Sequence, residues 1–463
     1  MGATALALAG CLPIEKPDAS IAPPSNFKAA KGSPGGAPAN VAWWRAFRSP
    51  ELTRIMEAVE TDNFDIGAAA YRIVQADAQA RIAGAALLPT LDGAANASRI
   101  RSAGLGGSRG TERNLFLTSL SASYEIDFWG KNRAALTAAQ DAAQASRFDR
   151  DTVALSTLAT TATTYFNLLG AQDRLRIARD NLASASRVLA LIRERVAVGT
   201  ATSLDEAQQA TVVAQLRAAI PPLEQQIEQD GSTLAVLLGR APERVAIKGG
   251  GVSRVAFPRI DPGLPSELLA RRPDVRSAEE QLAAASADVT VARAQFYPSI
   301  QLTGQGGFES LALKSLFGPG AGFYTLAAGL AQPIFSGGRL EGQLQQAQGR
   351  QGELLELYRK SIVSAFADVE RALVAVRQLA RQEQLEAQAV ESSRKAYQIS
   401  EQRLREGTVD IVTVLNTQSS LFQSLDALAQ VRIARLQAIV ALYQALGGGW
   451  DLAPRRSRSV DTM

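Results

Sequence analysis

The sequence predicts an α+β membrane protein, built from two copies of one unit, that is complete only when several identical chains associate. Three features support this class: turns repeat at a fixed spacing, short runs alternate apolar and polar residues, and long proline-free runs have helical periodicity. Gly199 and Gly407 close matching runs 208 residues apart, and Gly239 and Gly447 repeat at the same spacing. A strand pair and a helix pair in each unit point to an assembled tube rather than a pocket enzyme.

The composition excludes several functional classes. Lys and Arg number 49 against 45 Asp and Glu, and the net charge of +4 is spread along 463 residues, so nucleic-acid binding is not expected. The chain has no histidine and Cys11 is its only cysteine, which excludes zinc sites, cysteine nucleophiles and imidazole bases. No metal or cofactor is expected. An enzyme would have to use carboxylates, lysine or tyrosine, and no cluster of these stands out.

The first eleven residues resemble the end of an export signal. The run Leu8-Ala9-Gly10-Cys11 is similar to the lipobox of bacterial lipoproteins, in which the cysteine is acylated and becomes the mature N-terminus. We therefore expect lipidation at Cys11 and an extended leader over residues 12–40. No run of about 18 apolar residues occurs, so any membrane crossing must use strands.

Four segments alternate apolar and polar residues with a period of two. The alternation is clearest over 114–128 and recurs after Pro89 and after Pro298, with glycine-rich connections at 104–110 and 318–322 that predict two hairpins. In each segment the apolar residues are expected on one side of the strand: Leu91, Ala95 and Ala97; Leu120, Ala122, Tyr124, Ile126 and Phe128; Ile300 and Leu302; Tyr324, Leu326, Ala328 and Leu330.

Four strands are too few for a closed barrel. A spanning strand needs about 9 to 11 residues, which these segments provide, and a barrel in lipid needs at least about 8 strands because an open edge is not tolerated there. Identical chains must therefore each donate four strands, and three chains give twelve. Soluble half-buried hairpins show the same alternation, so the pattern is not membrane-specific by itself.

Long helical hairpins are predicted after each strand pair. The segments 131–198 and 340–406 lack proline and carry apolar residues at three- and four-residue steps. Partner helices are expected over 203–238 and 413–446, with an interruption at Pro221-Pro222 in the first of them.

Glycine and polar residues are expected to cap these helices. Gly199 and Gly407 suit the left-handed position that ends a helix, and Ser203 with Glu206 forms a predicted capping box.

The repeat suggests a division of the chain. The first unit opens with a helical stretch, 41–86, in which Trp43 and Trp44 are expected to anchor packing, and Pro273 is expected to start a helix in the second unit. The expected segments are a truncated signal over 1–11, a leader over 12–40, a first repeat over 41–239, a linker over 240–264, a second repeat over 265–447 and a tail over 448–463.

Five fragments in order resemble the outer-membrane efflux channel family, and within it the lipoprotein branch. They are Trp43-Trp44-x-x-Phe47 with LLP at 87–89, RRPDVR from Arg271, FSGGR from Phe335, the turn around Gly407 and ALGGGW ending at Trp450. The resemblance covers nearly the whole chain, from about Cys11 to Trp450.

The resemblance implies a homotrimer with a twelve-stranded β-barrel in the bacterial outer membrane that continues into a long periplasmic α-helical barrel. It implies passive conduction of drugs or other small solutes. The implied partners are a periplasmic adaptor protein, an inner-membrane pump of the resistance-nodulation-division class and outer-membrane lipid.

In the family, helices beside the second tip constrict the periplasmic end, and an acidic and an arginine side chain help to set the constriction. Asn416 and Ser419 stand at those two positions here, which removes the family's ionic pair. The gate candidates are Asp205, Arg403, Arg405, Asp410, Val412, Asn416 and Ser419. Charges near helix tips also serve simply to solvate the helix ends, and both interpretations stay open. The tips expected to dock the adaptor are Val198, Gly199, Thr200, Glu406, Gly407 and Thr408.

Two other classes remain open at this point. A periplasmic coiled-coil adaptor or scaffold lipoprotein also suits long helical hairpins, and it would stay soluble after Cys11→Ser, whereas a duct would still require detergent. A carboxylate-based enzyme is disfavoured because no concentrated acidic pair occurs.

Overall fold

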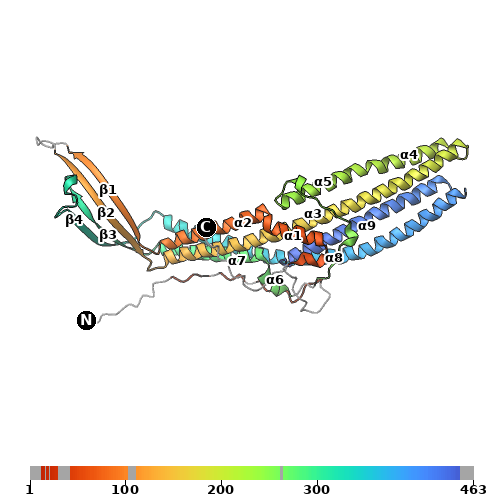
Figure 1. The fold of residues 1–463 in the computed structure, drawn as a ribbon. Coiled ribbons are helices and arrows are strands. Elements are labelled where there is room, and N and C mark those ends of the chain that lie inside the picture. The colour runs from red at the N-terminus through yellow and green to blue at the C-terminus, as the bar shows by residue number, and fades with distance from the viewer. Residues whose placement is uncertain are drawn as a thin grey trace. The chain divides into compact units, whose positions relative to one another are not determined.

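The computed structural model describes residues 12–15, 17–19, 21–29, 42–102, 111–260 and 264–448. The predicted lipidation site Cys11, the whole of the predicted 104–110 connection and almost all of the 448–463 tail lie outside the described residues. The chain forms two compact units, one of residues 1–20, 71–147 and 277–360, the other of residues 21–70, 148–276 and 361–463. Figure 1 shows the elements of both units.

The first unit contains one antiparallel sheet with the strand order β1-β2-β3-β4. Its strands are β1 Thr90–Arg101, β2 Glu112–Ile126, β3 Ser299–Ser310 and β4 Gly322–Ala331, with the short 3-10 helix η4 Leu313–Ser315 between the last two. Both predicted hairpins are present, and β2 of the first pairs with β3 of the second along eleven residue pairs. The two halves of the sequence therefore build a single sheet.

Four helices have residues in both units: α2 Phe64–Ala85, α3 Lys131–Ala197, α7 Pro273–Ala294 and α8 Arg339–Arg405. The two predicted long helices are thus continuous, each of 67 residues. At about 1.5 Å per residue each is about 100 Å long. No described helix combines the length and the hydropathy that a membrane crossing requires.

The second unit is helical. Its other elements are η1 Trp43–Phe47, α1 Pro50–Asp62, α4 Ser203–Ala218, α5 Ile220–Leu237, η2 Pro242–Arg244, η3 Val252–Arg254, α6 Pro265–Arg271 and α9 Ile411–Ala445. The return helix of the first repeat is interrupted at Ala219, two residues before Pro221, as predicted. Pro273 begins α7, also as predicted.

The core of the helical unit is aromatic. Trp43 stacks on Tyr443 with ring centroids 5.1 Å apart, and Phe47 contacts Phe166 at 5.0 Å. Trp43, Phe47 and Phe166 are at most 2% exposed. The predicted role of the tryptophans as packing anchors is confirmed, because they join the start of the first repeat to the end of the second.

Two local predictions were wrong. The capping box at the start of α4 uses Thr202 and Asp205 instead of Ser203 and Glu206. Thr202 accepts the Asp205 N–H at 3.2 Å and Asp205 accepts the Thr202 N–H at 2.8 Å, which leaves Glu206 to pair with Arg193. The helical stretch 41–86 is not continuous, because Asn63 ends α1 and its side chain caps α2 by accepting N–H groups from residues 65 and 66.

Candidate conducting, docking and gating surfaces

The strand register assembles one apolar face. Tyr124 pairs with Leu302, which pairs with Ala328, and Leu120 pairs with Gly306, which pairs with Tyr324. Because residues directly opposite each other in a sheet share a face, the predicted apolar residues within the strands all lie together. We call this the apolar face: Leu91, Ala95, Ala97, Phe116, Leu120, Ala122, Tyr124, Ile126, Ile300, Leu302, Phe308, Tyr324, Leu326, Ala328 and Leu330.

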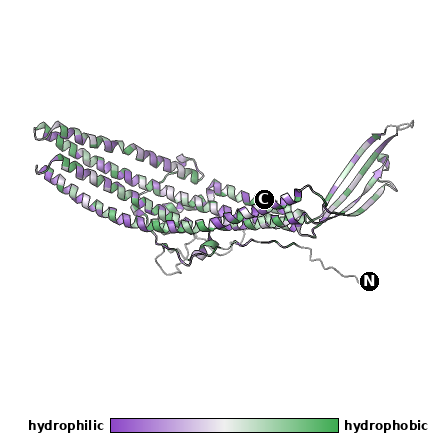
Figure 2. Cartoon of the chain, turned by 180° about the vertical axis from the view of Figure 1, so that it is seen from behind, coloured by the Kyte–Doolittle hydropathy of each residue, from purple (hydrophilic) through white to green (hydrophobic). Residues whose placement is uncertain are grey.

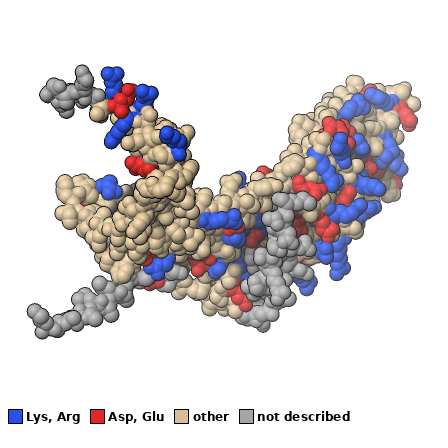
Figure 3. All heavy atoms as spheres, turned by 60° about the vertical axis from the view of Figure 1, so that its left-hand side comes forward, with Lys and Arg blue, Asp and Glu red and all other residues tan. Residues whose placement is uncertain are grey.

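The opposite side, the polar face, is lined mainly by small and polar residues, and it also carries the carboxylates Asp92, Glu125 and Glu309. Gln301 donates to the Ser123 hydroxyl at 3.0 Å and Gln305 to the Ser119 hydroxyl at 3.2 Å, which links β3 to β2. Figure 2 shows hydrophobic and hydrophilic residues interspersed along the strands, as the alternation requires. In the view of Figure 3 the strand surface is largely uncharged, and charged side chains gather toward its ends.

The exposure of the apolar face is unusual for a water-soluble surface. Tyr324 is 83% exposed and Leu326 78%. Within the described residues, the outer strands β1 and β4 are each paired on one side only. A large exposed apolar surface marks contact with a partner or a membrane, and unpaired strand edges require further strands in lipid.

Aromatic side chains stand at both ends of the sheet. At the end joined to the helices, Trp129 stacks on Tyr297 at 4.6 Å and donates its ring N–H to the Pro298 carbonyl at 2.8 Å. At the other end Phe308 contacts Phe317 at 5.2 Å. Aromatic girdles of this kind flank the apolar band of membrane barrels.

The predicted docking tips have the same backbone geometry in both repeats. Gly199 has φ of 77° and Gly407 of 70°. At each tip the glycine N–H binds the carbonyl three residues earlier, and the following threonine N–H binds the carbonyl five residues earlier, at 2.8 Å for Thr200 and 2.9 Å for Thr408. Both hydroxyls donate to that same carbonyl. This is the Schellman motif, and it leaves Val198 and Glu406 exposed.

An arginine that sequence reasoning missed joins the two tips. Arg195, in the last turn of α3, donates to the Leu404 carbonyl at 2.5 Å and to the Arg405 carbonyl at 3.3 Å, at the end of α8. A cation suits the negative end of a helix. The sequence places Arg195 near the end of a predicted helix, but this position does not identify its hydrogen-bond partner.

The two aspartates proposed for the gate act as caps. Asp205 belongs to the capping box of α4. Asp410 accepts the Thr413 hydroxyl at 2.6 Å and the Thr413 N–H at 2.9 Å at the start of α9. These hydrogen bonds lower the pKa of Asp410 below its ordinary value. Since the folded-state pKa is lowered, the cap is present at neutral pH and is lost as the pH falls through that pKa.

The remaining gate candidates are exposed on two helices. Val412, Asn416 and Ser419 follow one another on the exposed side of α9, opposite the buried residues Val414 and Gln418. On α8, Arg403 is exposed and Arg405 pairs with Glu401 at 2.7 Å. Asn416 and Ser419 form one uncharged polar stripe, whereas the arginines lie on the other helix.

Beneath this stripe lies a polar layer that the sequence did not reveal. The Tyr397 hydroxyl contacts the Ser184 hydroxyl at 3.0 Å and accepts from Gln418 at 3.2 Å. The Ser400 and Thr417 hydroxyls are 2.6 Å apart. These contacts join α3, α8 and α9 between apolar side chains, and buried polar pairs of this kind specify helix register.

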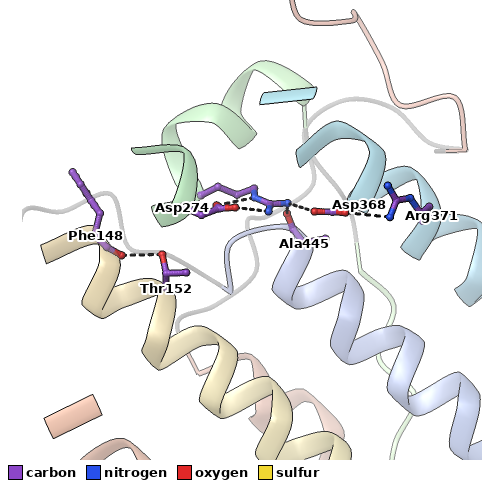
Figure 4. A network of polar contacts seen from close by, with 7 residues as sticks. Phe148, Thr152, Asp274, Asp368, Arg371 and Ala445 are labelled. Atoms are coloured by element: carbon purple, nitrogen blue, oxygen red, sulfur yellow. Dashed lines mark hydrogen bonds and ion pairs between the residues drawn. The ribbon is translucent and has the colours of Figure 1, made fainter. Parts of the chain in front are cut away.

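The RRPDVR fragment forms a partly buried ion cluster, shown in Figure 4. Arg272 is bidentate to Asp274, at 3.0 and 2.6 Å, and also donates to Asp368 at 3.1 Å and to the Ala445 carbonyl at 3.4 Å. The planar guanidinium suits this fork geometry. The cluster ties the start of α7 to α8 and to the end of α9.

The two-faced open sheet and the helical hairpins together define a membrane-inserted channel subunit. The chain belongs to the outer membrane efflux protein family, whose model matches residues 56–240 and again residues 264–448. It is 44% identical to the pyoverdine export outer membrane protein OpmQ of Pseudomonas putida, with 96% of each chain covered. It is 42% identical to OpmQ of Pseudomonas aeruginosa, covering 94% of this chain and 93% of that protein, and 32% identical to the toluene efflux pump outer membrane protein TtgI of Pseudomonas putida, covering 88% and 87%.

Solved structures agree with this assignment. The outer-membrane channel OprN has a TM-score of 0.89 at 26% identity, with 94% of this chain and 99% of that chain covered. The open state of the Neisseria gonorrhoeae MtrE channel has a TM-score of 0.84 at 29% identity, with 94% and 97% covered. The predicted family and fold class are therefore confirmed, and the chain is an outer-membrane exit duct for efflux.

Proposed function

We propose that three copies of this chain form the duct of a tripartite pump, joined to a periplasmic adaptor and an inner-membrane pump of the resistance-nodulation-division class, with no catalytic activity of the chain's own. The observation that carries the proposal is the pairing of an exposed apolar face with a face of small polar residues on a sheet with two open edges. Three such sheets place the apolar faces in lipid and the polar faces around a water-filled lumen. We propose also that acylated Cys11 anchors the duct and that 41–239 and 265–447 are its two repeats.

The proposed cargo is a secreted metabolite of the pyoverdine kind. The relatives named for pyoverdine export are 44% and 42% identical to this chain, whereas the relative named for toluene efflux is 32% identical. The hydroxyl and amide side chains of the polar face also suit a hydrated cargo better than an apolar solvent.

Planar bilayer recording of the purified protein tests the duct. Discrete conductance steps from trimeric material are expected. A protein that stays monomeric and electrically silent contradicts the proposal. A Cys11→Ser variant that still requires detergent excludes the soluble adaptor or scaffold alternative.

The gate proposal predicts an effect of Asn416→Asp. Three symmetry copies would place a ring of carboxylates at the constriction, so cation selectivity should rise and the conductance should change. Gln398→Glu is the matched control, because it adds the same charge to an exposed position on α8. Reversal potentials in a salt gradient measure the effect, and currents unchanged from the wild type place Asn416 outside the pore.

The docking proposal predicts an effect of Gly407→Val. No atom lies within 4 Å of a Cβ at this position, so the cost comes from the left-handed backbone, about 1–2 kcal/mol. The tip should lose its Schellman turn, and efflux should fall at equal expression. Gly352→Val is the control, since that glycine also has open space around it but lies within α8 without a positive φ. Full efflux by the Gly407→Val variant argues against docking at this tip.

A further inference from the structure

We propose that Arg99 and Arg101 form a binding site for the phosphate groups of anionic lipid in the outer leaflet of the outer membrane. The proposal rests on the barrel assembly put forward above. The partner is defined by its chemistry: a phosphorylated lipid headgroup at the outer border of the hydrocarbon layer of the membrane.

The register puts both arginines on the apolar face. Arg99 pairs with Asn114 and Arg101 pairs with Glu112, two and four residue pairs beyond the pair of Ala97 and Phe116. Alternate residues of a strand share a face, so Arg99 and Arg101 continue the apolar side toward the β1–β2 end of the sheet. Figure 3 shows charged side chains at an end of the strand surface.

A third arginine at the same end lies on the other face. Arg113 pairs with Ile100, between the rows of Arg99 and Arg101, and therefore projects from the polar face. The chain thus provides two arginines that border lipid and one that borders the lumen, at nearly the same height.

The height of these arginines fits a headgroup layer. Ile126 and Phe116 are ten positions apart on β2, which is about 33 Å along the strand at about 3.3 Å per residue. A strand tilt of about 40° converts this length into a vertical height of about 25 Å, the height of the apolar band in membrane barrels. The aromatic residues Phe116 and Phe308 lie near the border of this band that faces away from the helices. Arg99 stands only about 7 Å beyond Phe116 along the strand direction.

The orientation of the site follows from the connections. Helices adjoin the strand ends at Thr90 and Ile126, whereas Arg101 and Glu112 lie at the opposite ends of the same strands. With the helices on the periplasmic side, the arginines emerge at the outer leaflet.

Both arginines are open to a ligand. Arg99 is 70% exposed in its side chain and pairs with Glu112 at 3.0 Å, a carboxylate that is itself 48% exposed. Exposed pairs of this kind contribute little to stability, so a phosphate can displace the carboxylate. Within the described part of the chain Arg101 has no ion-pair partner. A guanidinium binds phosphate through two parallel hydrogen bonds, which suits this exchange.

The test measures binding of purified full-length trimer to vesicles of phosphatidylcholine with and without lipid A. The double variant Arg99→Gln with Arg101→Gln should weaken lipid A binding about 25-fold, which is about five-fold for each arginine. Arg113→Gln should change it less than about two-fold, although it removes the same charge as either Arg99→Gln or Arg101→Gln alone, each of which accounts for about five-fold. Glu112→Gln should strengthen binding, because it removes the competing carboxylate.

Three results overturn the proposal. The first is a loss of lipid A affinity in Arg113→Gln as large as that in the double variant. The second is a lipid A affinity that is unchanged in the double variant. The third is competition by inorganic phosphate that is as effective as competition by lipid A, which would indicate a free-phosphate site. The variants are also recorded in planar bilayers. Wild-type channels that conduct but do not prefer lipid A refute this site alone, whereas silent protein refutes the duct.

Discussion

Leu326→Arg is expected to prevent insertion of the chain into the outer membrane. Leu326 is 78% exposed and pairs with Gly304, in a middle row of the apolar face. An arginine at the bilayer midplane of a barrel costs about 2–4 kcal/mol, and a trimer incurs that cost three times. The yield of heat-resistant trimer in isolated outer membranes measures the effect, and it should fall by at least about ten-fold.

Thr325→Arg is the matched control for this prediction. Thr325 is the neighbouring residue and pairs with Gln305 on the polar face, so its arginine should point into water and permit insertion. A conductance change without a loss of trimer is expected from it. If the two variants insert equally well, the assignment of the faces to lipid and lumen is wrong.

Phe47→Ala is expected to destabilise the helical unit by about 3–5 kcal/mol. Phe47 is 0% exposed and its ring lies among those of Trp43, Phe166 and Tyr443. Removing it leaves a cavity where the first and second repeats meet. The midpoint of thermal or denaturant unfolding, followed by circular dichroism, measures the loss.

Phe64→Ala provides the comparison, because Phe64 is 74% exposed and should lose less than about 0.5 kcal/mol. Similar midpoints for the two variants would show that the aromatic cluster does not hold the repeats together.

The strand faces and the long helices could be predicted because both depend on local periodicity. The alternation alone assigned Leu120 and Tyr124 to one side of their strand and Leu302 to the apolar side of another, and the register brings these two sides onto one face. The long proline-free segments became α3 and α8 with ends within one residue of the prediction. Gly199 and Gly407 were predictable because few other residues adopt a positive φ.

The errors and omissions have a common origin in local ambiguity or in contacts distant in sequence. Thr202 and Ser203 are both good N-caps, so a shift of one residue could not be excluded by composition. The contacts of Arg195 with Leu404 and of Arg272 with Asp368 join residues more than 90 positions apart, and no local pattern specifies such partners. The sequence located the tips correctly but not the contacts that join them.

The central claim is that identical chains close one barrel through the edges of β1 and β4. Cysteine cross-linking in membranes tests it directly, with Ala95→Cys on β1 combined in one chain with Ala328→Cys on β4, and with neighbouring apolar-face positions scanned in steps of two residues. A disulfide requires Cα atoms about 4.4–6.8 Å apart, so only paired edges can form it. The account predicts covalent trimers on a denaturing gel for at least one pair and none for either single variant. Monomers alone at every pair would contradict it.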